Sequence, residues 1–253
     1  TLLANQEGGY SQLGLLNATN QWKNVLWLLP TVLAPVTLAM ASSLRSDQGQ
    51  DSSYKIMDLS QGTTVLLVVP AATLLMCLAT SILAIYGATF VQGQTIFVLM
   101  IYGVALAAVE NTAGIAVQSA SKMWLAMCMN LVWGITYLAT SWLLVGQYGA
   151  VALGIGFALG YFILGVPGHY LLYRLGLIPS SMLMRVAGVT GLLTALAAMM
   201  IVISSSTALW LAIPATALCL LICVVFWTPA TVKSRLIAES KNMLLRKRIS
   251  TTP

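Results

Sequence analysis

The chain is short of charge. Only 7% of its 253 residues are charged, whereas a soluble domain usually has about 25%, and 59% of the residues are hydrophobic. Charge is missing from seven apolar runs, each about 20 residues or longer, which is the length that a helix needs to cross the hydrocarbon core. The runs cover residues 25–44, 64–86, 95–118, 123–145, 149–172, 183–203 and 207–227. We therefore expect an all-α fold, a polytopic membrane bundle of seven transmembrane helices.

Side chains that support catalysis are scarce. His169 is the only histidine, so a zinc site built from several histidines is excluded. All four cysteines (Cys77, Cys128, Cys219 and Cys223) lie inside apolar runs. The last two are four residues apart and could hold a metal or a disulfide, but packing as small apolar residues is favoured. The chain also has no phosphate-binding P-loop, no nucleophile elbow and no zinc-protease motif. We expect no enzyme, no catalytic residue, no metal and no cofactor.

The basic residues fall mostly on one side of the expected membrane bundle. If the seven runs alternate in direction, eleven of the twelve Lys and Arg residues share a side, and only Lys23 lies opposite. The eleven are Arg45, Lys55, Lys122, Arg174, Arg185, Lys233, Arg235, Lys241, Arg246, Lys247 and Arg248. By the positive-inside rule the basic side faces the cytoplasm. We expect a multi-pass protein of the inner (cytoplasmic) membrane with a cytoplasmic C-terminus.

This topology divides the chain into three segments. Residues 1–24 form an external polar segment without the features of a signal peptide, 25–227 form the membrane domain, and 228–253 form a basic cytoplasmic tail. The tail mixes apolar and basic residues, which predicts a helix lying on the anionic inner leaflet. The external start, the odd number of spans and Thr1 favour the C-terminal part of a longer membrane protein. A natural chain with an external N-terminus remains an alternative.

Polar side chains inside the runs are the main candidates for a site. Glu110 is the only acidic residue in any run; Asn111 and Gln118 follow it, and Asn130 lies in the next run. A charge near the bilayer centre costs roughly 2.5–3.5 kcal/mol on insertion scales and normally faces a cavity or a partner. Glu110 is therefore a candidate for binding an ion or a substrate. The alternative is a hydrogen-bonded carboxyl that ties two helices together.

Three basic residues at the expected cytoplasmic span ends are further candidates. Lys122, Arg174 and Arg185 lie where an anionic substrate would approach the bundle. Residues of this kind more often anchor a helix by reaching into the headgroup layer. A GxxxG pattern formed by Gly156 and Gly160 predicts that another helix approaches the fifth run closely.

Three blocks of the chain carry a family resemblance. They lie at 8–44, 68–94 and 119–162, and the resemblance extends over roughly residues 8–175. The matching positions are Gly9, Tyr10, Pro35, Pro70, Tyr86, Gly87, Phe90, Lys122, Asn130, Tyr148, Gly149, Ala150 and Gly154. In order and spacing they resemble the polysaccharide flippases of the multidrug/oligosaccharidyl-lipid/polysaccharide exporter superfamily. The chain departs from the pattern where Leu13 and Gly14 replace a small residue after Tyr10.

The resemblance implies a function in glycan export. Longer members of that family have fourteen spans with both ends cytoplasmic, so this chain would supply the last seven and would need the missing N-terminal half as a partner. Such proteins move an undecaprenyl-linked oligosaccharide (an O-antigen, capsule or exopolysaccharide unit) to the periplasmic leaflet. The implied mechanism is alternating access between two lobes. The implied partners are the lipid-linked oligosaccharide and membrane lipids, with no nucleic acid.

Two other functions stay open at this point. One is a cation-coupled transporter of the same fold, although such proteins usually carry more buried acidic residues than Glu110 alone. The other is a membrane-embedded enzyme or factor of polysaccharide assembly. Asp47, Asp51 and Asp58 share one connection and would be its acidic residues, but they form no compact motif.

Overall fold

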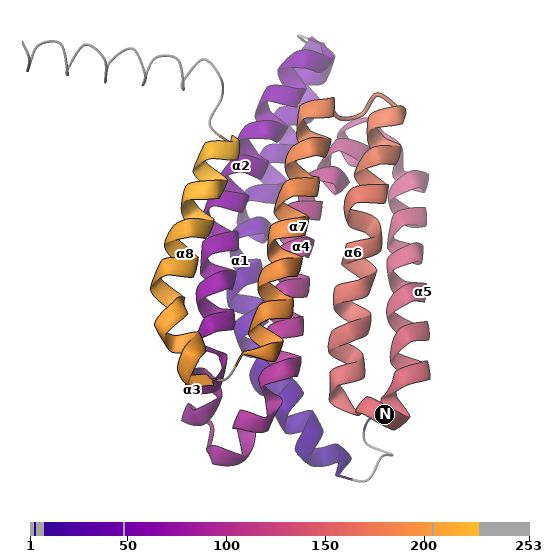
Figure 1. Ribbon diagram of the computed structural model, residues 1–253. Helices are drawn as coiled ribbons and strands as arrows, with labels where there is room; N and C mark the ends of the chain where they lie inside the picture. Colours follow the sequence, from indigo (N-terminus) through magenta and orange to yellow (C-terminus); the bar gives the residue numbers. More distant parts are fainter. Residues whose placement is uncertain (1–2, 4–7, 48, 204, 228–253) are drawn as a thin grey trace, which may run out of the picture.

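The protein is a bundle of long helices. The computed structural model describes residues 3, 8–47, 49–203 and 205–227, and this part of the chain contains helices and no strand (Figure 1). The helices are α1 (Gly9–Asp47), α2 (Gln50–Cys77), α3 (Ala79–Ile85), the 3-10 helix η1 (Ala88–Gly93), α4 (Gln94–Ser119), α5 (Met123–Tyr148), α6 (Ala150–Arg174), α7 (Ser180–Val202) and α8 (Ser205–Trp227). The expected all-α membrane bundle is confirmed.

The apolar runs correspond closely to these helices. Among the described residues, six helical segments are long and apolar enough to cross a membrane. The expected second run is divided, because α2 ends at Cys77 and α3 continues it to Ile85. The seventh run forms α8, which has 23 residues, the same number as α7. The seven-span expectation therefore fits approximately, with six helical segments that meet the length and composition of a span and α8 at the position of the seventh run.

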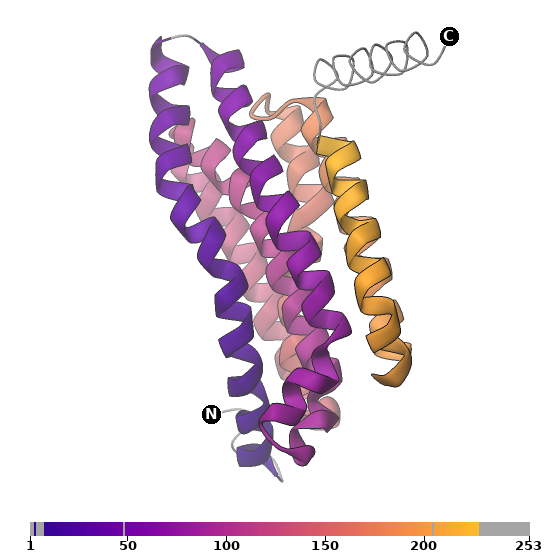
Figure 2. The ribbon, with the colours of Figure 1, turned by 90° about the vertical axis from the view of Figure 1, so that its left-hand side faces the viewer.

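Helix α1 is much longer than its apolar run. It has 39 residues, which at 1.5 Å per residue gives roughly 58 Å, whereas the hydrocarbon core is about 30 Å thick. Residues 9–24 of the expected external segment are therefore helical and belong to α1. The axis of α1 changes direction along its length in Figure 2, consistent with Pro30 and Pro35 inside the helix. The expected tail, 228–253, lies outside the described residues.

Helix α4 occupies the middle of the bundle. It packs against α1, α2, α6 and α7, and most of its side chains are buried. Helix α5 lies at the edge and packs mainly against α6 (Figure 1). Its outer face exposes large apolar side chains such as Trp124, Trp142 and Leu143. In a membrane such a face contacts lipid, so polar residues on the central α4 face the protein interior instead.

One end of the bundle collects the basic residues of the connections. The end of α1, the start of α2, the α4–α5 turn and the α6–α7 turn meet there, at the top of Figure 1. Arg45, Lys122 and Arg174 lie in or beside these segments. We refer to this end as the basic end. The grouping agrees with the sequence expectation, and which side of the membrane it faces stays a prediction.

Candidate functional site

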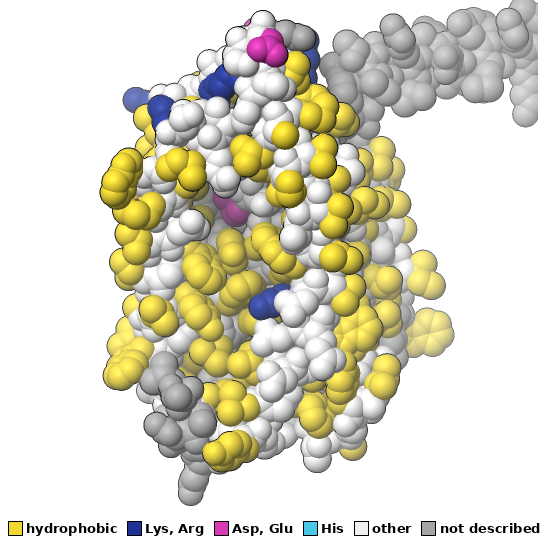
Figure 3. Space-filling view, turned by 180° about the vertical axis from the view of Figure 1, so that it is seen from behind, with side chains coloured by type: hydrophobic (Ala, Val, Ile, Leu, Met, Phe, Trp, Pro, Cys, Tyr) yellow, Lys and Arg dark blue, Asp and Glu magenta, His cyan; other side chains and the backbone are white. Residues whose placement is uncertain are grey.

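The polar residues of the spans converge on one cavity. The cavity has a volume of about 230 Å³ and lies between α1, α4, α5 and α6. Its lining consists of Trp27, Ala107, Glu110, Asn111, Gly114, Gln118, Ala126, Met129, Asn130, Tyr161 and Leu164, and we refer to it as the central cavity. Figure 3 shows an acidic side chain deep in a hollow of an otherwise largely apolar face. The structure thus brings together Glu110, Asn111, Gln118 and Asn130, four of the seven sequence candidates.

Helix periodicity explains why these residues share a surface. On α4 the lining positions follow the spacing i, i+3, i+4, i+7 and i+11, which marks one stripe of an α-helix. They are Ala107, Glu110, Asn111, Gly114 and Gln118. The lining residues of α5, Ala126, Met129 and Asn130, have the spacing i, i+3, i+4. Those of α6, Tyr161 and Leu164, have the spacing i, i+3. Each helix therefore contributes a single face to the cavity.

Glu110 has a partner that the sequence analysis missed. Its Oε2 lies 3.4 Å from Nδ1 of His169 on α6, and the exposed fractions of the two side chains are 9% and 0%. The same Nδ1 lies 3.0 Å from the carbonyl oxygen of Gly165. A carbonyl oxygen can only accept, so Nδ1 carries a hydrogen and donates it. The sequence shows only that His169 is the single histidine, and nothing in the linear spacing links it to Glu110.

Gly165 of α6 lies beside the carboxyl group. A Cβ added at Gly165 would lie 3.5 Å from Glu110 Oε1 and 3.8 Å from Thr190 Oγ1 of α7. Glu110, His169 and Thr190 therefore meet around Gly165 where α4, α6 and α7 pack together. His169 Nε2 and Thr190 Oγ1 are buried and have no hydrogen-bond partner among the described protein atoms. Most buried polar atoms do have one, so these two mark a place suited to a polar ligand or a proton.

Aromatic rings line the contact between α5 and α6 next to the cavity. Tyr161 belongs to the cavity lining and packs against Phe157 and Trp133, with ring centroids 5.2 and 5.4 Å apart. Trp133 also stacks on Tyr137 at 5.6 Å. The Lys23 ammonium of α1 lies 5.2 Å from the centre of the Phe157 ring. From the sequence, Lys23 is predicted only to be the single basic residue on the opposite side of the membrane.

The close approach expected at Gly156 and Gly160 is confirmed, and it holds these rings in place. A Cβ at Gly156 would lie 2.7 Å from Ser141 Oγ, and one at Gly160 would lie 2.8 Å from Trp133 Cδ1. Both distances are too short for an ordinary side chain, so α5 rests directly on the backbone of α6.

The other three sequence candidates lie apart from the central cavity. Lys122 lines a second pocket at the basic end. Arg174 donates a hydrogen bond of 2.9 Å to the Tyr170 hydroxyl, one helical turn away on α6. Arg185 of α7 forms an ion pair of 2.5 Å with Asp58 of α2. The basic candidates therefore do not share a site with Glu110.

Comparison with known proteins supports the fold. No family model and no curated protein sequence matches the chain. Among solved structures it is similar to the lipid II flippase MurJ in an inward closed conformation, with a TM-score of 0.56 and 13% sequence identity. The match covers 85% of this chain and 47% of that one, so the chain spans about half the length of the flippase. The fold is flippase-like. The protein is a multi-pass membrane protein, while the polysaccharide branch and the C-terminal placement stay predictions.

Proposed function

We propose that this chain takes part in moving a lipid-linked oligosaccharide across the cytoplasmic membrane, as one portion of a larger transporter. The observation that supports this most is the central cavity, in which one carboxyl and three carboxamide side chains meet inside an apolar bundle. Carboxamides both donate and accept hydrogen bonds, as sugar hydroxyls do. A lipid tail can stay in the bilayer while a polar head group passes through such a cavity.

The lining suggests how a glycan would be held. Asn111, Gln118 and Asn130 would bind hydroxyls, while Tyr161 and Trp27 offer aromatic surface to the apolar face of a sugar. The volume of about 230 Å³ is below the roughly 300–1,000 Å³ of pockets that enclose a drug-sized ligand. The cavity would therefore hold part of a glycan and would widen during transport. This fits alternating access, in which helices rock around a binding site near the membrane centre.

The experiment measures glycan export in cells that depend on the full-length protein and lack any other flippase for that glycan. Asn111→Ala, Gln118→Ala and Asn130→Ala should each reduce surface glycan and increase the lipid-linked precursor. Gln147→Ala is the matched control, because Gln147 is an exposed carboxamide near the end of α5 and is not part of the cavity lining. Normal export by a well-expressed triple variant would contradict the proposal.

One observation favours a cation-coupled transporter as the second candidate. The buried contact between Glu110 and His169 provides two groups that can exchange a proton or balance a bound cation. Export of glycan by vesicles containing the purified protein would separate the two candidates. A protein that moves small organic cations against an imposed ion gradient, and leaves the lipid-linked glycan in place, would favour the second.

We propose a transport role rather than an enzymatic one. Of the three aspartates that would support an assembly enzyme, Asp58 pairs with Arg185. That contact holds α2 to α7 and uses the Asp58 carboxylate in an ion pair between helices.

A further inference from the structure

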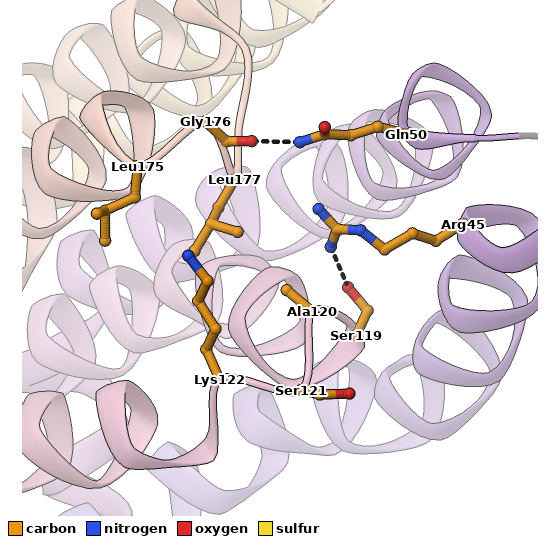
Figure 4. A pocket seen from close by; sticks show the side chains of 9 residues that line it. All are labelled: Arg45, Gln50, Ser119, Ala120, Ser121, Lys122, Leu175, Gly176 and Leu177. Atoms are coloured by element: carbon orange, nitrogen blue, oxygen red, sulfur yellow. Dashed lines mark hydrogen bonds between the residues drawn. The ribbon is translucent and has the colours of Figure 1, made fainter.

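A second pocket lies at the basic end of the bundle. It has a volume of about 430 Å³ and is formed by the end of α1, the start of α2, the α4–α5 turn and the α6–α7 turn. Its lining is Arg45, Gln50, Ser119, Ala120, Ser121, Lys122, Leu175, Gly176 and Leu177, and we refer to it as the basic-end pocket. Figure 4 shows the side chains of Arg45 and Lys122 approaching it from different elements.

From this arrangement we infer that the basic-end pocket binds a phosphate or diphosphate group. Two of its nine lining residues are cationic and none is acidic, and the Ser121 hydroxyl is a further donor. The donors of Gln50 and Ser119 are used within the protein, on the carbonyl oxygens of Gly176 and Ala116. A guanidinium group binds two phosphate oxygens at once, and an ammonium group adds a compact positive charge. The preference for an anion follows from the pocket alone. Its assignment to the head group of a lipid-linked substrate rests on the proposed function.

The charged groups of the pocket remain available to a ligand. Arg45 Nη1 is 3.4 Å from Ser119 Oγ, a long hydrogen bond that occupies one of the five N–H groups of the guanidinium. Ser119 in turn donates to the carbonyl oxygen of Ala116 at 3.1 Å. Lys122 is exposed at the turn between α4 and α5. Neither cation forms an ion pair with a described carboxylate.

The walls of the pocket are fixed by contacts between distant segments. The Tyr54 hydroxyl donates to the carbonyl oxygen of Gly176 at 2.6 Å, and the side-chain amide of Gln50 donates to the same oxygen. These bonds hold the start of α2 against the α6–α7 turn. Arg45 is thereby kept near the α4–α5 turn without the ordering cost that a mobile connection would impose on binding.

The two turns that face the pocket have the same backbone hydrogen-bond pattern but different residues in the left-handed position, Gly176 and Ser121. After α6, Leu177 N–H donates to Leu172 O and Gly176 N–H to Tyr173 O, both at 2.9 Å, which is a Schellman motif with glycine in the left-handed position, φ 65°. After α4, the same two bonds run from Lys122 to Val117 (3.1 Å) and from Ser121 to Gln118 (2.9 Å).

The second turn has Ser121 where glycine is usual. Ser121 has φ 57° and is the only non-glycine residue with a positive φ in the described part of the chain. A left-handed φ is unfavourable for a residue with a Cβ, so a serine here is better explained by its hydroxyl than by the turn. Ser121 belongs to the residues that line the pocket and precedes Lys122 in the chain, so its hydroxyl is the group that we expect to donate to a phosphate oxygen.

The position of the pocket also suits a lipid phosphate. Helices α4 and α6 end at the pocket and α5 begins there, so it lies where the membrane-spanning segments stop. Lipid phosphates occupy this level of a bilayer, just outside the hydrocarbon core. If the basic end is cytoplasmic, the diphosphate of an incoming lipid-linked glycan would reach this pocket before the sugar enters the central cavity.

The test is direct binding to the full-length protein in neutral-lipid nanodiscs. Inorganic diphosphate is titrated by calorimetry, and polyprenyl diphosphate in phosphatidylcholine vesicles is the second probe. Arg45→Gln and Lys122→Gln should each weaken diphosphate binding by roughly tenfold or more, because each removes a charged donor. Ser121→Gly preserves the left-handed turn and relieves its strain, so thermal stability should not fall. Because it removes the hydroxyl, it should weaken diphosphate binding about threefold.

Arg174→Gln is the matched control, since Arg174 is a basic residue at the same end that bonds to Tyr170 and does not line the pocket. Unchanged binding by the Arg45→Gln/Lys122→Gln double variant would overturn the inference, as would an equal loss in Arg174→Gln. Competition between free diphosphate and the polyprenyl diphosphate would support the lipid as the source. If free diphosphate binds and polyprenyl diphosphate does not, the pocket is a phosphate site and the lipid is excluded as its ligand.

Binding and export are measured separately, so the two proposals can fail separately. A protein that binds diphosphate through Arg45 and Lys122 but exports no glycan keeps the phosphate site and contradicts the proposed function. If export depends on the central cavity but the basic-end pocket binds no anion, the proposed function stands and the phosphate site is contradicted.

Discussion

Glu110 and His169 meet inside the bundle, with 3.4 Å between the carboxylate Oε2 of α4 and the imidazole Nδ1 of α6. The pair ties two membrane helices together, and its carboxyl group also lines the central cavity. The two interpretations of Glu110 from the sequence, a structural tie and a ligand-binding group, therefore describe the same side chain. A change of charge at Glu110 would alter the cavity and the α4–α6 contact at once.

The first prediction concerns the charge of Glu110. Glu110→Gln keeps the size and hydrogen bonding of the side chain, so expression and membrane insertion of the full-length protein should stay near normal. Glycan export should fall and should lose its dependence on pH or sodium, because the amide cannot titrate. Surface glycan and accumulated lipid-linked precursor are the measurements. Normal export by Glu110→Gln, together with low protein levels for Glu110→Ala, would leave only the structural role.

The second prediction concerns the energetic coupling of the pair. Glu110→Gln should lower the free energy of unfolding by only about 0.5–1.5 kcal/mol, because the amide can still hydrogen-bond to His169. His169→Gln should lower it by about 3 kcal/mol, because it leaves the carboxyl group buried without the imidazole. The double variant should cost less than the sum of the single variants, with a coupling of roughly 0.5–3 kcal/mol. Denaturant unfolding in detergent measures all three.

The control for this cycle is Gln147→Ala combined with His169→Gln. Gln147 is exposed near the far end of α5, so its effect should add to that of His169→Gln within about 0.5 kcal/mol. If Glu110→Gln and His169→Gln add in the same way, the 3.4 Å contact contributes nothing to stability.

The third prediction concerns the packing of α5 on α6. Gly156→Ala would place a methyl group 2.7 Å from Ser141 Oγ and 2.9 Å from the carbonyl oxygen of Tyr137. The helices would have to separate, which should cost roughly 1–3 kcal/mol and lower the thermal midpoint. Gly134→Ala is the control, because a Cβ there meets no atom within 4 Å and alanine favours a helix. Equal midpoints for the two variants would show that the contact can relax freely.

The fourth prediction concerns orientation. A reporter active only in the periplasm should give signal when fused after Ser205 and none when fused after Ser180. The basis is the collection of basic residues at one end of the bundle. A reporter active only in the cytoplasm, fused at the same two positions, should give the opposite pattern. Reversed results from both reporters would place the basic end on the periplasmic side. The basic-end pocket would then not face the cytoplasmic leaflet.

Hydropathy predicted the membrane helices well and their ends less well. The exclusion of charge from the hydrocarbon core is a local and strong constraint, so six full-length spans and α8 could be located from composition alone. The start of α1 could not, because residues 9–24 are polar enough to lie outside the hydrocarbon core and still form a helix. Hydropathy reports where a helix is apolar and says little about where the helix begins.

Part of the central cavity could also be anticipated. Glu110, Asn111, Gln118 and Asn130 stand out because polar side chains are costly inside a membrane, and helix periodicity puts the first three on one stripe of α4. Lys122, Arg174 and Arg185 stood out equally in the sequence. Only their contacts separated the first, which lines a pocket, from the other two, which bond to Tyr170 and Asp58.

The sequence by itself determined that this protein is a helical membrane bundle with one buried carboxyl group and its basic residues collected at one end. These properties depend on the transfer of each segment from water to lipid, which is additive along the chain. The tertiary structure alone decided that His169 is the partner of Glu110 and that four separate segments enclose the basic-end pocket. Such contacts depend on which helix faces meet, and small residues such as Gly156 and Gly160 decide that through packing in three dimensions.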